Sequence, residues 1–341
     1  MAGPSREIAA VRVAVRRWLS RGRPEHRFLV ACSGGADSLA LAAAVRFVAP
    51  RLGVGCGLVT VDHGLQPGSA PRAAAVVDWA GREGLIPAVV ETVSVAGRPG
   101  GPEAAAREAR YEALVRAARR CDAASVLLGH TLEDQAETVL LAVLRGSGLS
   151  GLAGMPVVRA VDGVRLVRPL LGVSRAQTRA ACAALGNTAW EDPHNRDPSY
   201  ARTHARALLE SYVDALGPAV VRNLARTARL AAVDADLLGS LAVEALARAT
   251  ETDGGLRIDT LAALPPALRG RVLKGWARSH GVVGSALSHR HIEALEALVV
   301  DWHGQGPVHL PGSIPVVRRD GRLRIGHVTT PGHADGGVHA E

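Results

Sequence analysis

The stretch Phe28-Leu-Val-Ala-Cys32-Ser-Gly-Gly-Ala-Asp-Ser38-Leu-Ala-Leu-Ala-Ala-Ala-Val45 decides how the rest of the chain is organised. Its first part, Phe28 to Cys32, is short and apolar, as expected of a buried parallel strand. Its last part, Leu39 to Val45, is rich in strong helix formers. A strand, a glycine turn and a helix start in this order bring free backbone N–H groups and the positive end of a helix dipole to one point. The sequence therefore predicts an anion-binding loop here.

The side chains of this loop refine the prediction. Gly34 and Gly35 let the backbone approach a phosphate without a Cβ atom in the way, and Ser33 and Ser38 add hydroxyl donors. A carboxylate beside a phosphate is repulsive unless a cation lies between them, so we expect Asp37 to bind Mg²⁺ or to face a cationic substrate. The loop has neither the Gly-Lys-Ser/Thr of a Walker A loop nor the GxGxxG of a dinucleotide site. The alternative is an ordinary serine- and glycine-rich turn.

Strand and helix patterns alternate beyond this loop. Strands are expected over 56–61, 87–93 and 124–129, and helices over 71–83, 103–120 and 133–144. This alternation predicts an α/β fold with a doubly wound parallel sheet, in which ligands bind at the carboxyl ends of the strands. The polar or glycine residues at those ends are Ser33, Asp62, His63, Gly129 and His130. We expect them to share one site.

The flanking segments define the domain organisation. Helices are expected over 5–20 and 174–185, a hairpin over 157–170 that turns at Asp162-Gly163, and continuous helix over 202–248. Alternation around glycine and proline predicts a small β-like tail over 301–326. We therefore predict a catalytic domain over 1–214, a mainly helical domain with a short β tail over 215–326, and a disordered C-terminus over 327–341.

Composition bounds the class of protein. The 341 residues are 48% hydrophobic but only 3% aromatic, and the formal net charge is +8, which favours a polyanionic partner without excluding an ordinary basic protein. The four cysteines form no C-x-x-C pair, so a zinc ribbon or an iron–sulfur site is not expected. No apolar run reaches membrane-spanning length, and apolar neighbours around the cysteines indicate thiols in a reducing compartment, so we expect a cytoplasmic protein.

A second polar motif runs from Gly129 to Thr138. Asp134 or Glu137 can project from the first turns of the helix expected there toward the strand ends. The alternative is that the acids only complement the helix dipole. Basic stripes occur further on at helical spacing, with solvated surface as the alternative to RNA contact. Their members are Arg222, Arg226 and Arg229, and then Arg271, Lys274 (the single lysine of the chain) and Arg278.

These motifs resemble known families. The Ser33 to Ser38 loop resembles the SGGxDS signature of the PP-loop ATP pyrophosphatases, which have an adenine nucleotide alpha hydrolase-like fold. The run from Gly129 to Met155, with Val61 to Pro67 and Trp190 to Arg202, is similar to motifs of the tRNA(Ile)-lysidine synthases. The chain departs from those motifs at Glu133, where Asp is usual, and at His194, where Ser is usual. After Arg202 it has Thr-His-Ala-Arg206 in place of Asn and a second Arg, which leaves a base- or phosphate-contacting role of Arg206 open.

The resemblance implies an enzyme that joins L-lysine to the wobble cytidine of the CAU anticodon of isoleucine tRNA. ATP and Mg²⁺ take part, an adenylated cytidine forms, and pyrophosphate and AMP leave. The alternatives are a PP-loop enzyme that thiolates a tRNA base and a non-catalytic nucleotide sensor that binds RNA. The oligomeric state is open, with a homodimer among the options.

The resemblance and the residue patterns together assign the site residues. Asp37, Asp134, Arg202 and Arg206 are the expected catalytic residues, and Asp37 the expected Mg²⁺ ligand. ATP is expected to contact Ser33, Gly34, Gly35, Asp37, Ser38, Asp62, His63, Gly129 and His130. Lysine is expected at Asp134 and Glu137. The tRNA is expected at Arg107, Arg110, Arg145, Arg222, Arg226, Arg271 and Lys274.

Overall fold

The structure is a computed structural model that describes residues 4–23, 25–64, 66, 68–95, 97, 101–191, 201–284 and 286–326, without the side chains of 101–104. Two predictions therefore lie outside the described residues. One concerns positions 192–200, including His194, and the other the C-terminus over 327–341.

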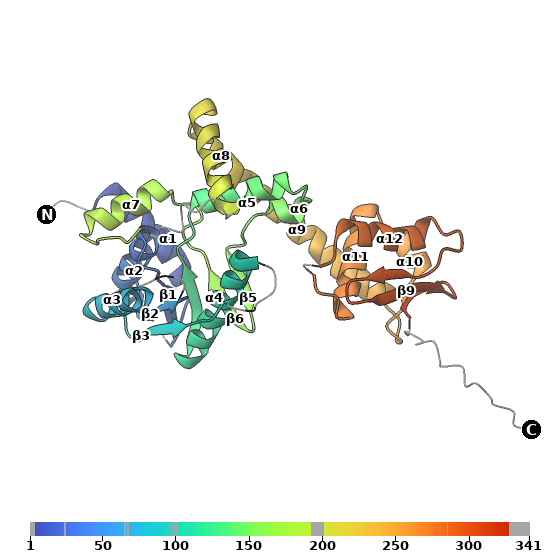
Figure 1. The fold of residues 1–341 in the computed structure, drawn as a ribbon, viewed down its shortest axis with the longest axis horizontal. Helices are drawn as coiled ribbons and strands as arrows, with labels where there is room; N and C mark the ends of the chain where they lie inside the picture. The colour runs from blue at the N-terminus through green and yellow to red at the C-terminus, as the bar shows by residue number, and fades with distance from the viewer. Residues whose placement is uncertain are drawn as a thin grey trace, which may run out of the picture. The chain divides into compact units, whose positions relative to one another are not determined.

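A six-stranded sheet organises the first part of the chain, in the order β3-β2-β1-β4-β6-β5 (Figure 1). All neighbouring strands are parallel except the hairpin partners β5 and β6. This arrangement confirms the predicted α/β fold with a doubly wound sheet. The strands are β1 (Arg27–Ala31), β2 (Gly55–Asp62), β3 (Ala88–Thr92), β4 (Ala123–Leu128), β5 (Val158–Val161) and β6 (Val164–Val167).

The central strand β1 is buried on both faces because its successive side chains enter different cores. Phe28 and Val30 pack with the helices α1 (Arg6–Leu19), α2 (Ala36–Val48) and α7 (Arg175–Ala184). Leu29 and Ala31 pack with α4 (Gly101–Arg120) on the other side of the sheet. The helices of this part are α1 (Arg6–Leu19), α2 (Ala36–Val48), α3 (Ser69–Arg82), α4 (Gly101–Arg120), α5 (Leu132–Leu144), α6 (Leu149–Leu152), α7 (Arg175–Ala184), α8 (Ala201–Leu216) and α9 (Ala219–Ala249), with a short 3₁₀ turn at Pro50–Leu52.

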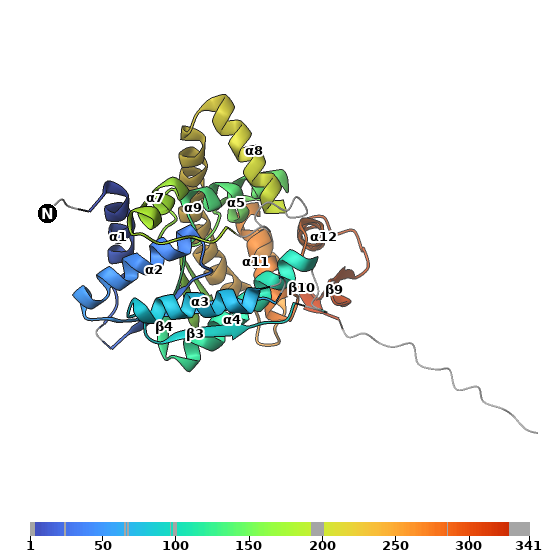
Figure 2. The ribbon, with the colours of Figure 1, turned by 60° about the vertical axis from the view of Figure 1, so that its left-hand side comes forward.

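Local sequence signals account for the ends of several elements. The β5–β6 hairpin turns at Asp162 and Gly163, as predicted, and both have positive φ angles of 47° and 82°. The expectation of continuous helix over 202–248 was wrong at one point. Gly217, with φ of 84°, and Pro218 separate α8 from α9, which Figure 2 shows as two helices meeting at a turn.

The contacts within the chain divide it between Ala232 and Val233, inside α9. The expected boundary at residue 215 lies earlier. Val220, Val221 and Leu224, in the first turns of α9, still pack against Leu140 and Leu209 of the first unit, so the contacts of that unit continue into this helix.

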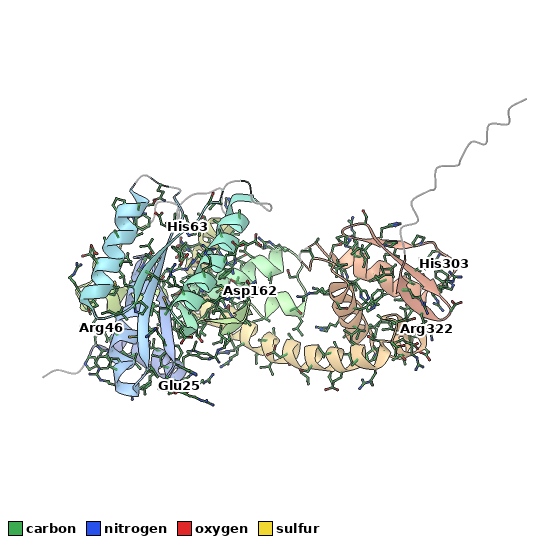
Figure 3. The ribbon with its side chains drawn as sticks, turned by 90° about the horizontal axis from the view of Figure 1, so that it is seen from below. Glu25, Arg46, His63, Asp162, His303 and Arg322 are labelled. Carbon is green, nitrogen blue, oxygen red and sulfur yellow. The ribbon has the colours of Figure 1, made fainter. Side chains whose placement is uncertain are left out.

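The second unit has its own four-stranded antiparallel sheet, in the order β7-β10-β9-β8. Its core surrounds Trp276, which is 1% exposed. Ion pairs join the sheet to the turn that follows α9, as between Arg322, labelled in Figure 3, and Glu251 at 2.8 Å, both half-buried. The elements are β7 (Leu256–Arg257), α10 (Ile258–Ala262), α11 (Pro266–Ser279), α12 (His289–Val300), β8 (Val308–Leu310), β9 (Ile314–Arg319) and β10 (Arg322–Ile325).

No helix in the described part of the chain combines the length and the apolar character that crossing a membrane requires.

Candidate nucleotide and amine site

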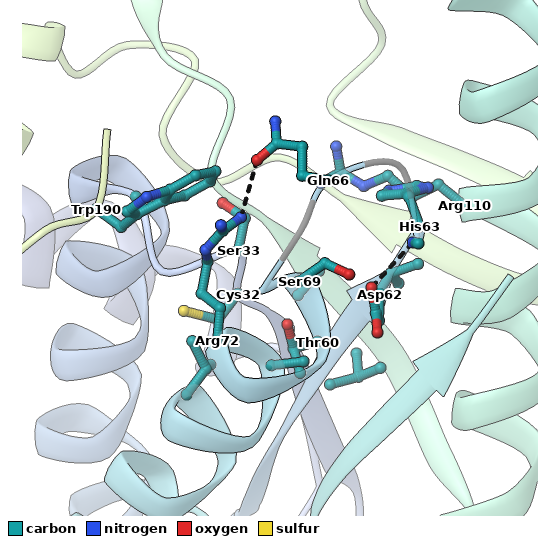
Figure 4. Close-up of a pocket in the computed structure, with 17 residues that line it drawn as sticks. Cys32, Ser33, Thr60, Asp62, His63, Gln66, Ser69, Arg72, Arg110 and Trp190 are labelled. Atoms are coloured by element: carbon teal, nitrogen blue, oxygen red, sulfur yellow. Dashed lines mark hydrogen bonds between the residues drawn. The ribbon is translucent and has the colours of Figure 1, made fainter. Parts of the chain in front are cut away.

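A cavity of about 290 Å³ opens at the carboxyl ends of β1 and β2, where the sheet topology predicts a ligand site. Four of the residues predicted to contact ATP line it, namely Ser33, Gly35, Asp62 and His63, and so does Arg110 of α4, which was predicted to contact tRNA. Figure 4 shows Ser33 at one end of the cavity and His63, Asp62 and Arg110 at the other. The remaining lining comes from β1 and β2 and the residues that follow them, from α3, and from Gln66 and Trp190. The members are Ala31, Cys32, Val59, Thr60, Val61 and Gly64 of the first group and Ser69, Arg72, Ala73 and Val76 of α3.

The glycine loop before α2 has the geometry of an anion site. Gly34 has φ of 81°, and a Cβ atom there would lie 3.2 Å from Val76 Cγ2. Gly35 is the N-cap of α2, and no side chain caps that helix. Ser38 Oγ accepts a bond from Ser33 N at 3.2 Å and donates to Gly35 O at 2.9 Å, so this hydroxyl fixes the loop. The first N–H groups of α2 therefore face the cavity end without a protein cap.

The residues at the end of β4 pack closely against the start of α2. A Cβ atom at Gly129 would lie 3.2 Å from both Ser38 Cα and Ser38 N, so only glycine lets β4 pass this close to the start of α2. His130 is half-buried, and burial, reinforced by Arg110, Arg168 and Arg202, lowers its pKa to about 3. Its imidazole is therefore neutral at physiological pH, so it can donate or accept a hydrogen bond but carries no positive charge. Neither Gly129 nor His130 lines the cavity.

An acidic cluster lies behind the loop and joins α2, α5 and α7. Arg175, the first residue of α7, is at its centre. Arg175 Nη2 donates to Asp134 Oδ1 and to Glu137 Oε1, each at 3.1 Å, and Arg175 Nε lies 4.0 Å from Asp37 Oδ2. Arg206 of α8 donates from Nε to the same Glu137 oxygen at 3.1 Å. The structure therefore brings together the three predicted acids and one of the two predicted catalytic arginines.

One oxygen of the cluster lacks a protein partner. Glu137 is 1% exposed, and its Oε2 atom accepts no hydrogen bond within the described part of the chain. A buried carboxylate oxygen without a donor is costly, and an ammonium group is a donor that would satisfy it. This is a structural sign that the cluster holds a cation from outside the protein.

The two aspartates of the cluster differ in their pKa values. Burial raises the pKa of Asp37, although the Thr178 hydroxyl and Arg175 oppose that rise. Burial would also raise the pKa of Asp134, but Arg175, His130 and the Thr131 N–H together hold it below the usual value. Asp37 is therefore the better proton acceptor of the two, and Asp134 the more firmly charged.

A group of arginines surrounds Tyr111 on the α4 side. The Arg107 and Arg159 guanidinium carbons lie 5.2 and 5.1 Å from the centre of its ring, and Arg168 Nη2 donates to its hydroxyl at 3.4 Å. Arg110 and Arg202 add to the positive potential of Arg107 and Arg168. Arg110, Arg168 and Arg202 together contribute to the lowered pKa of His130. Among the described residues no acid forms an ion pair with Arg107, Arg110 or Arg202, so their charge is available to an anion.

The other basic positions predicted to contact tRNA do not line the cavity. Arg145 follows α5 and is exposed, and Arg222 and Arg226 are exposed on α9. Arg271, half-buried, donates to Ala267 O at 2.7 Å, and Lys274 is exposed; both are on α11 in the second unit. They form surface stripes, as the helical spacing indicates.

Sequence reasoning missed Arg72, Arg175 and Thr178. Thr178 donates a very short hydrogen bond to Asp37, and Glu133, the residue that departs from the family pattern, accepts from Arg175 N at 2.7 Å. These residues lie on helices rather than at strand ends, so the strand-end rule could not find them. The signal that existed was Ser174, whose N-cap places Arg175 and Thr178 in the first turn of α7.

The fold and the glycine loop define the class of protein. The family model described as "PP-loop domain" matches residues 9–211, and the model described as "TilS substrate binding domain" matches residues 256–324. The chain thus combines a PP-loop nucleotide-binding domain with a second domain of a named family.

Relatives of known name define the family more closely. The chain is 61% identical to the tRNA(Ile)-lysidine synthase of Salinispora tropica over 324 residues, which are 95% of this chain and 97% of the relative. It is 48% identical to the tRNA(Ile)-lysidine synthase of Streptomyces coelicolor over 350 residues, 95% of this chain and 99% of that protein. The chain belongs to the tRNA(Ile)-lysidine synthase family.

A solved structure shows the same fold. The U34-tRNA thiolase NcsA from Methanococcus maripaludis, determined with its [4Fe-4S] cluster, superimposes with a TM-score of 0.54 over 66% of this chain and 80% of that one. The sequences are 17% identical, so the likeness concerns the fold alone.

Proposed function

We propose that this protein ligates L-lysine to the wobble cytidine of the CAU anticodon of isoleucine tRNA, in two ATP-dependent steps. One observation carries the proposal. Asp37 belongs both to the nucleotide loop and to the buried acidic cluster, so a triphosphate site and a cation site share one residue. ATP fits the first site, and the ammonium group of lysine fits the second. ATP and tRNA as substrates suit a cytoplasmic enzyme.

The first step transfers AMP to the cytidine. Its O2 oxygen attacks the α-phosphorus, and the bond to the β-phosphate breaks to release pyrophosphate. Negative charge grows on the departing group, and the open N-terminus of α2 with the Gly34-Gly35 loop stabilises it. Arg110 lines the same cavity without an acidic partner among the described residues, so it adds positive charge there.

The second step joins lysine to the activated base. The lysine amine attacks C2, the bond from C2 to the adenylated oxygen breaks, and AMP leaves. The amine must first lose a proton, since a protonated amine has no lone pair. Asp37, whose pKa burial raises, is suited to accept it, whereas Asp134 stays charged and holds the ammonium beforehand.

The acidic cluster offers one unsatisfied oxygen to an ammonium group. Asp37, Asp134 and Glu137 form ion pairs with Arg175, and Glu137 also forms one with Arg206. Glu137 Oε2 accepts no hydrogen bond from the described residues, so an ammonium group there would satisfy it. We therefore assign the lysine ammonium to Glu137 and Asp134.

Magnesium fits the site in a limited way. Within the described residues no group of three or more His, Cys, Asp or Glu side chains could hold a metal by itself. Mg²⁺ in nucleotide enzymes commonly uses one or two carboxylates and the phosphates of the substrate, and Asp37 supplies such a carboxylate at the loop. Bound there, the ion would neutralise phosphate charge.

The tRNA is proposed to contact the basic residues outside the cavity. Arg107, Arg110 and Arg202, which form no ion pair among the described residues, adjoin the cavity through Arg110 and suit phosphates next to the target nucleotide. The stripe of Arg222 and Arg226 and that of Arg271 and Lys274 suit other phosphates of the RNA backbone. The cytidine has to leave its stack to reach the cavity.

The test separates the two half-reactions. The protein is incubated with ATP, labelled lysine and an isoleucine tRNA transcript, and pyrophosphate release and lysine incorporation are measured. Glu137→Gln should keep tRNA-dependent pyrophosphate release but raise the KM for lysine about 10- to 100-fold, because it removes a charged acceptor. Asp37→Ala should abolish pyrophosphate release.

Glu210→Gln, an exposed change on α8, is the matched control and should behave as the wild type. An unchanged KM for lysine in a folded Glu137→Gln variant would contradict the lysine assignment. Nucleotide binding without lysine incorporation by the wild type would favour an RNA-binding sensor, and sulfur transfer to the tRNA would favour a thiolase. The four cysteines, all free and three of them buried, do not favour the latter.

A further inference from the structure

Arg72 of α3 is a cation of the cavity wall that the proposed mechanism does not use. Its guanidinium carbon lies 3.4 Å from the centre of the Trp190 ring, and its Nη1 donates to Gln66 Oε1 at 3.3 Å (Figure 4). Within the described ranges no carboxylate forms an ion pair with it. The side chain is half-buried and holds its charge in the cavity without a neutralising acid.

The surroundings fix Arg72 relative to the phosphate loop. Trp190 N donates to Gly34 O at 2.9 Å, so the ring that carries the guanidinium is tied to the loop backbone. Val76, one turn further along α3, contacts the same loop where Gly34 lacks a Cβ atom. Stacking on Trp190 and the bond to Gln66 restrict the rotamers of Arg72 in advance, which lowers the entropic cost of binding an anion.

The position of Arg72 along the cavity indicates which part of the nucleotide it faces. Figure 4 shows Arg72 and Trp190 beside Ser33, at the loop end, and Arg110 beside His63 at the opposite end. The loop end is where the open helix N-terminus gathers phosphate groups. The second guanidinium nitrogen and Nε of Arg72 donate to no described residue, and a planar guanidinium presents such donors to phosphate oxygens in pairs.

We propose that Arg72, held by Trp190 and Gln66, binds the β- and γ-phosphates of ATP and the pyrophosphate formed from them. The inference rests on the proposed function, since it names which part of the ATP molecule this side chain recognises. It makes Arg72 a discriminator between ATP and AMP: the group it binds is present in the substrate and absent from the nucleotide product.

The test compares two ligands that differ only in that group. Dissociation constants of ATP and AMP are measured by calorimetry for the wild type, Arg72→Ala and Arg82→Ala. Arg82 lies on the same helix, is exposed and forms no ion pair within the described part of the chain, so it is the matched control. Arg72→Ala should weaken ATP about 10- to 100-fold, the effect of one charge-assisted pair, and leave AMP within about twofold.

Further variants separate charge from stacking. Arg72→Lys keeps the charge without the planar stack and should recover part of the ATP affinity. Trp190→Leu should weaken ATP in the same direction by less. Equal losses of ATP and AMP affinity in Arg72→Ala, or an unchanged ATP affinity, would overturn the inference, and the Arg72→Lys result decides the matter if the alanine variant fails to fold. Because binding is measured without lysine or tRNA, this outcome is independent of whether the wild type incorporates lysine.

Discussion

The first turns of α2 and α5 have similar sequences but differ in how their N-termini are capped. Each helix follows a central parallel strand, and each has an aspartate in its first turn, Asp37 in α2 and Asp134 in α5. At α5 the aspartate closes its own helix, because Asp134 Oδ2 accepts from Thr131 N at 2.7 Å in a capping box. At α2 the cap is Gly35, and Asp37 bonds away from the helix to Thr178.

The difference shows how one sheet edge can provide two kinds of site. The helix α2 has no side-chain cap and leaves its first N–H groups for phosphates. At the start of α5, one Asp134 oxygen accepts from Thr131 N, and the other faces the cation Arg175. The two interpretations of Asp134, dipole complement and cation ligand, are therefore compatible: one oxygen does the first and the other contacts Arg175.

The largest expected effect comes from a substitution in the loop before the uncapped helix α2. Gly34→Ala adds a Cβ atom 3.2 Å from Val76 Cγ2 at φ of 81°, so the loop backbone has to move away from its phosphate-binding position. ATP affinity should fall about 100-fold, as expected from the loss of one or two charge-assisted hydrogen bonds. Calorimetric titration with ATP measures it.

Gly53→Ala provides the control for backbone strain. Gly53 has φ of 67° and open space around its Cβ position, so it incurs a similar cost of about 1 kcal/mol in folding without touching the loop. Equal ATP affinities in the two alanine variants would show that the open N-terminus of α2 is not the phosphate site.

The second effect is a pair of opposite pH dependences. The raised pKa of Asp37 means that its ionisation destabilises the fold, so stability relative to Asp37→Asn should fall as pH rises from the usual value of 3.8 through the folded pKa. The lowered pKa of Asp134 means that its contribution is present above 3.8 and is lost as pH falls through the folded pKa.

Urea unfolding of the wild type, Asp37→Asn and Asp134→Asn across this pH range measures both slopes. Asp214→Asn, an exposed change on α8, should show neither. Slopes of the same sign for the two variants would mean that the two helix starts do not differ in the way the contacts indicate.

The smallest expected effect comes from weakening the capping box at the N-terminus of α5. Thr131→Val removes the buried hydroxyl of the capping box and keeps nearly the same volume, so the free energy of unfolding should fall by about 1 kcal/mol. Thermal unfolding measures the change, with Thr227→Val on the exposed face of α9 as the control. An unchanged or raised free energy of unfolding in Thr131→Val would show that the capping box does not stabilise α5.

Much of the nucleotide end could be predicted because its signals are local. Strand, glycine turn and helix are contiguous in the sequence, and the strand-end rule placed Ser33, Asp62 and His63 at one cavity before any contact was known. The hairpin at Asp162 and Gly163 followed from turn chemistry in the same way.

The acidic cluster around Arg175 could be predicted only in part, because its contacts join residues that lie far apart in the sequence. Arg175 contacts Asp134 and Glu137 about forty positions earlier in the chain, and periodicity says nothing of such partners. The same holds for Arg72, whose stack on Trp190 joins α3 to a loop after α7. The division inside α9 was hidden because a continuous helix has no change in composition at that point.

One structural feature gives the molecule an experimental handle. Lys274, exposed on α11, carries the only side-chain amine in the sequence. Apart from the N-terminal amine, an amine-reactive dye can therefore modify the folded protein at one position alone, and that position lies in the second unit. A fluorophore placed there reports on the second unit when tRNA binds, without a single engineered cysteine.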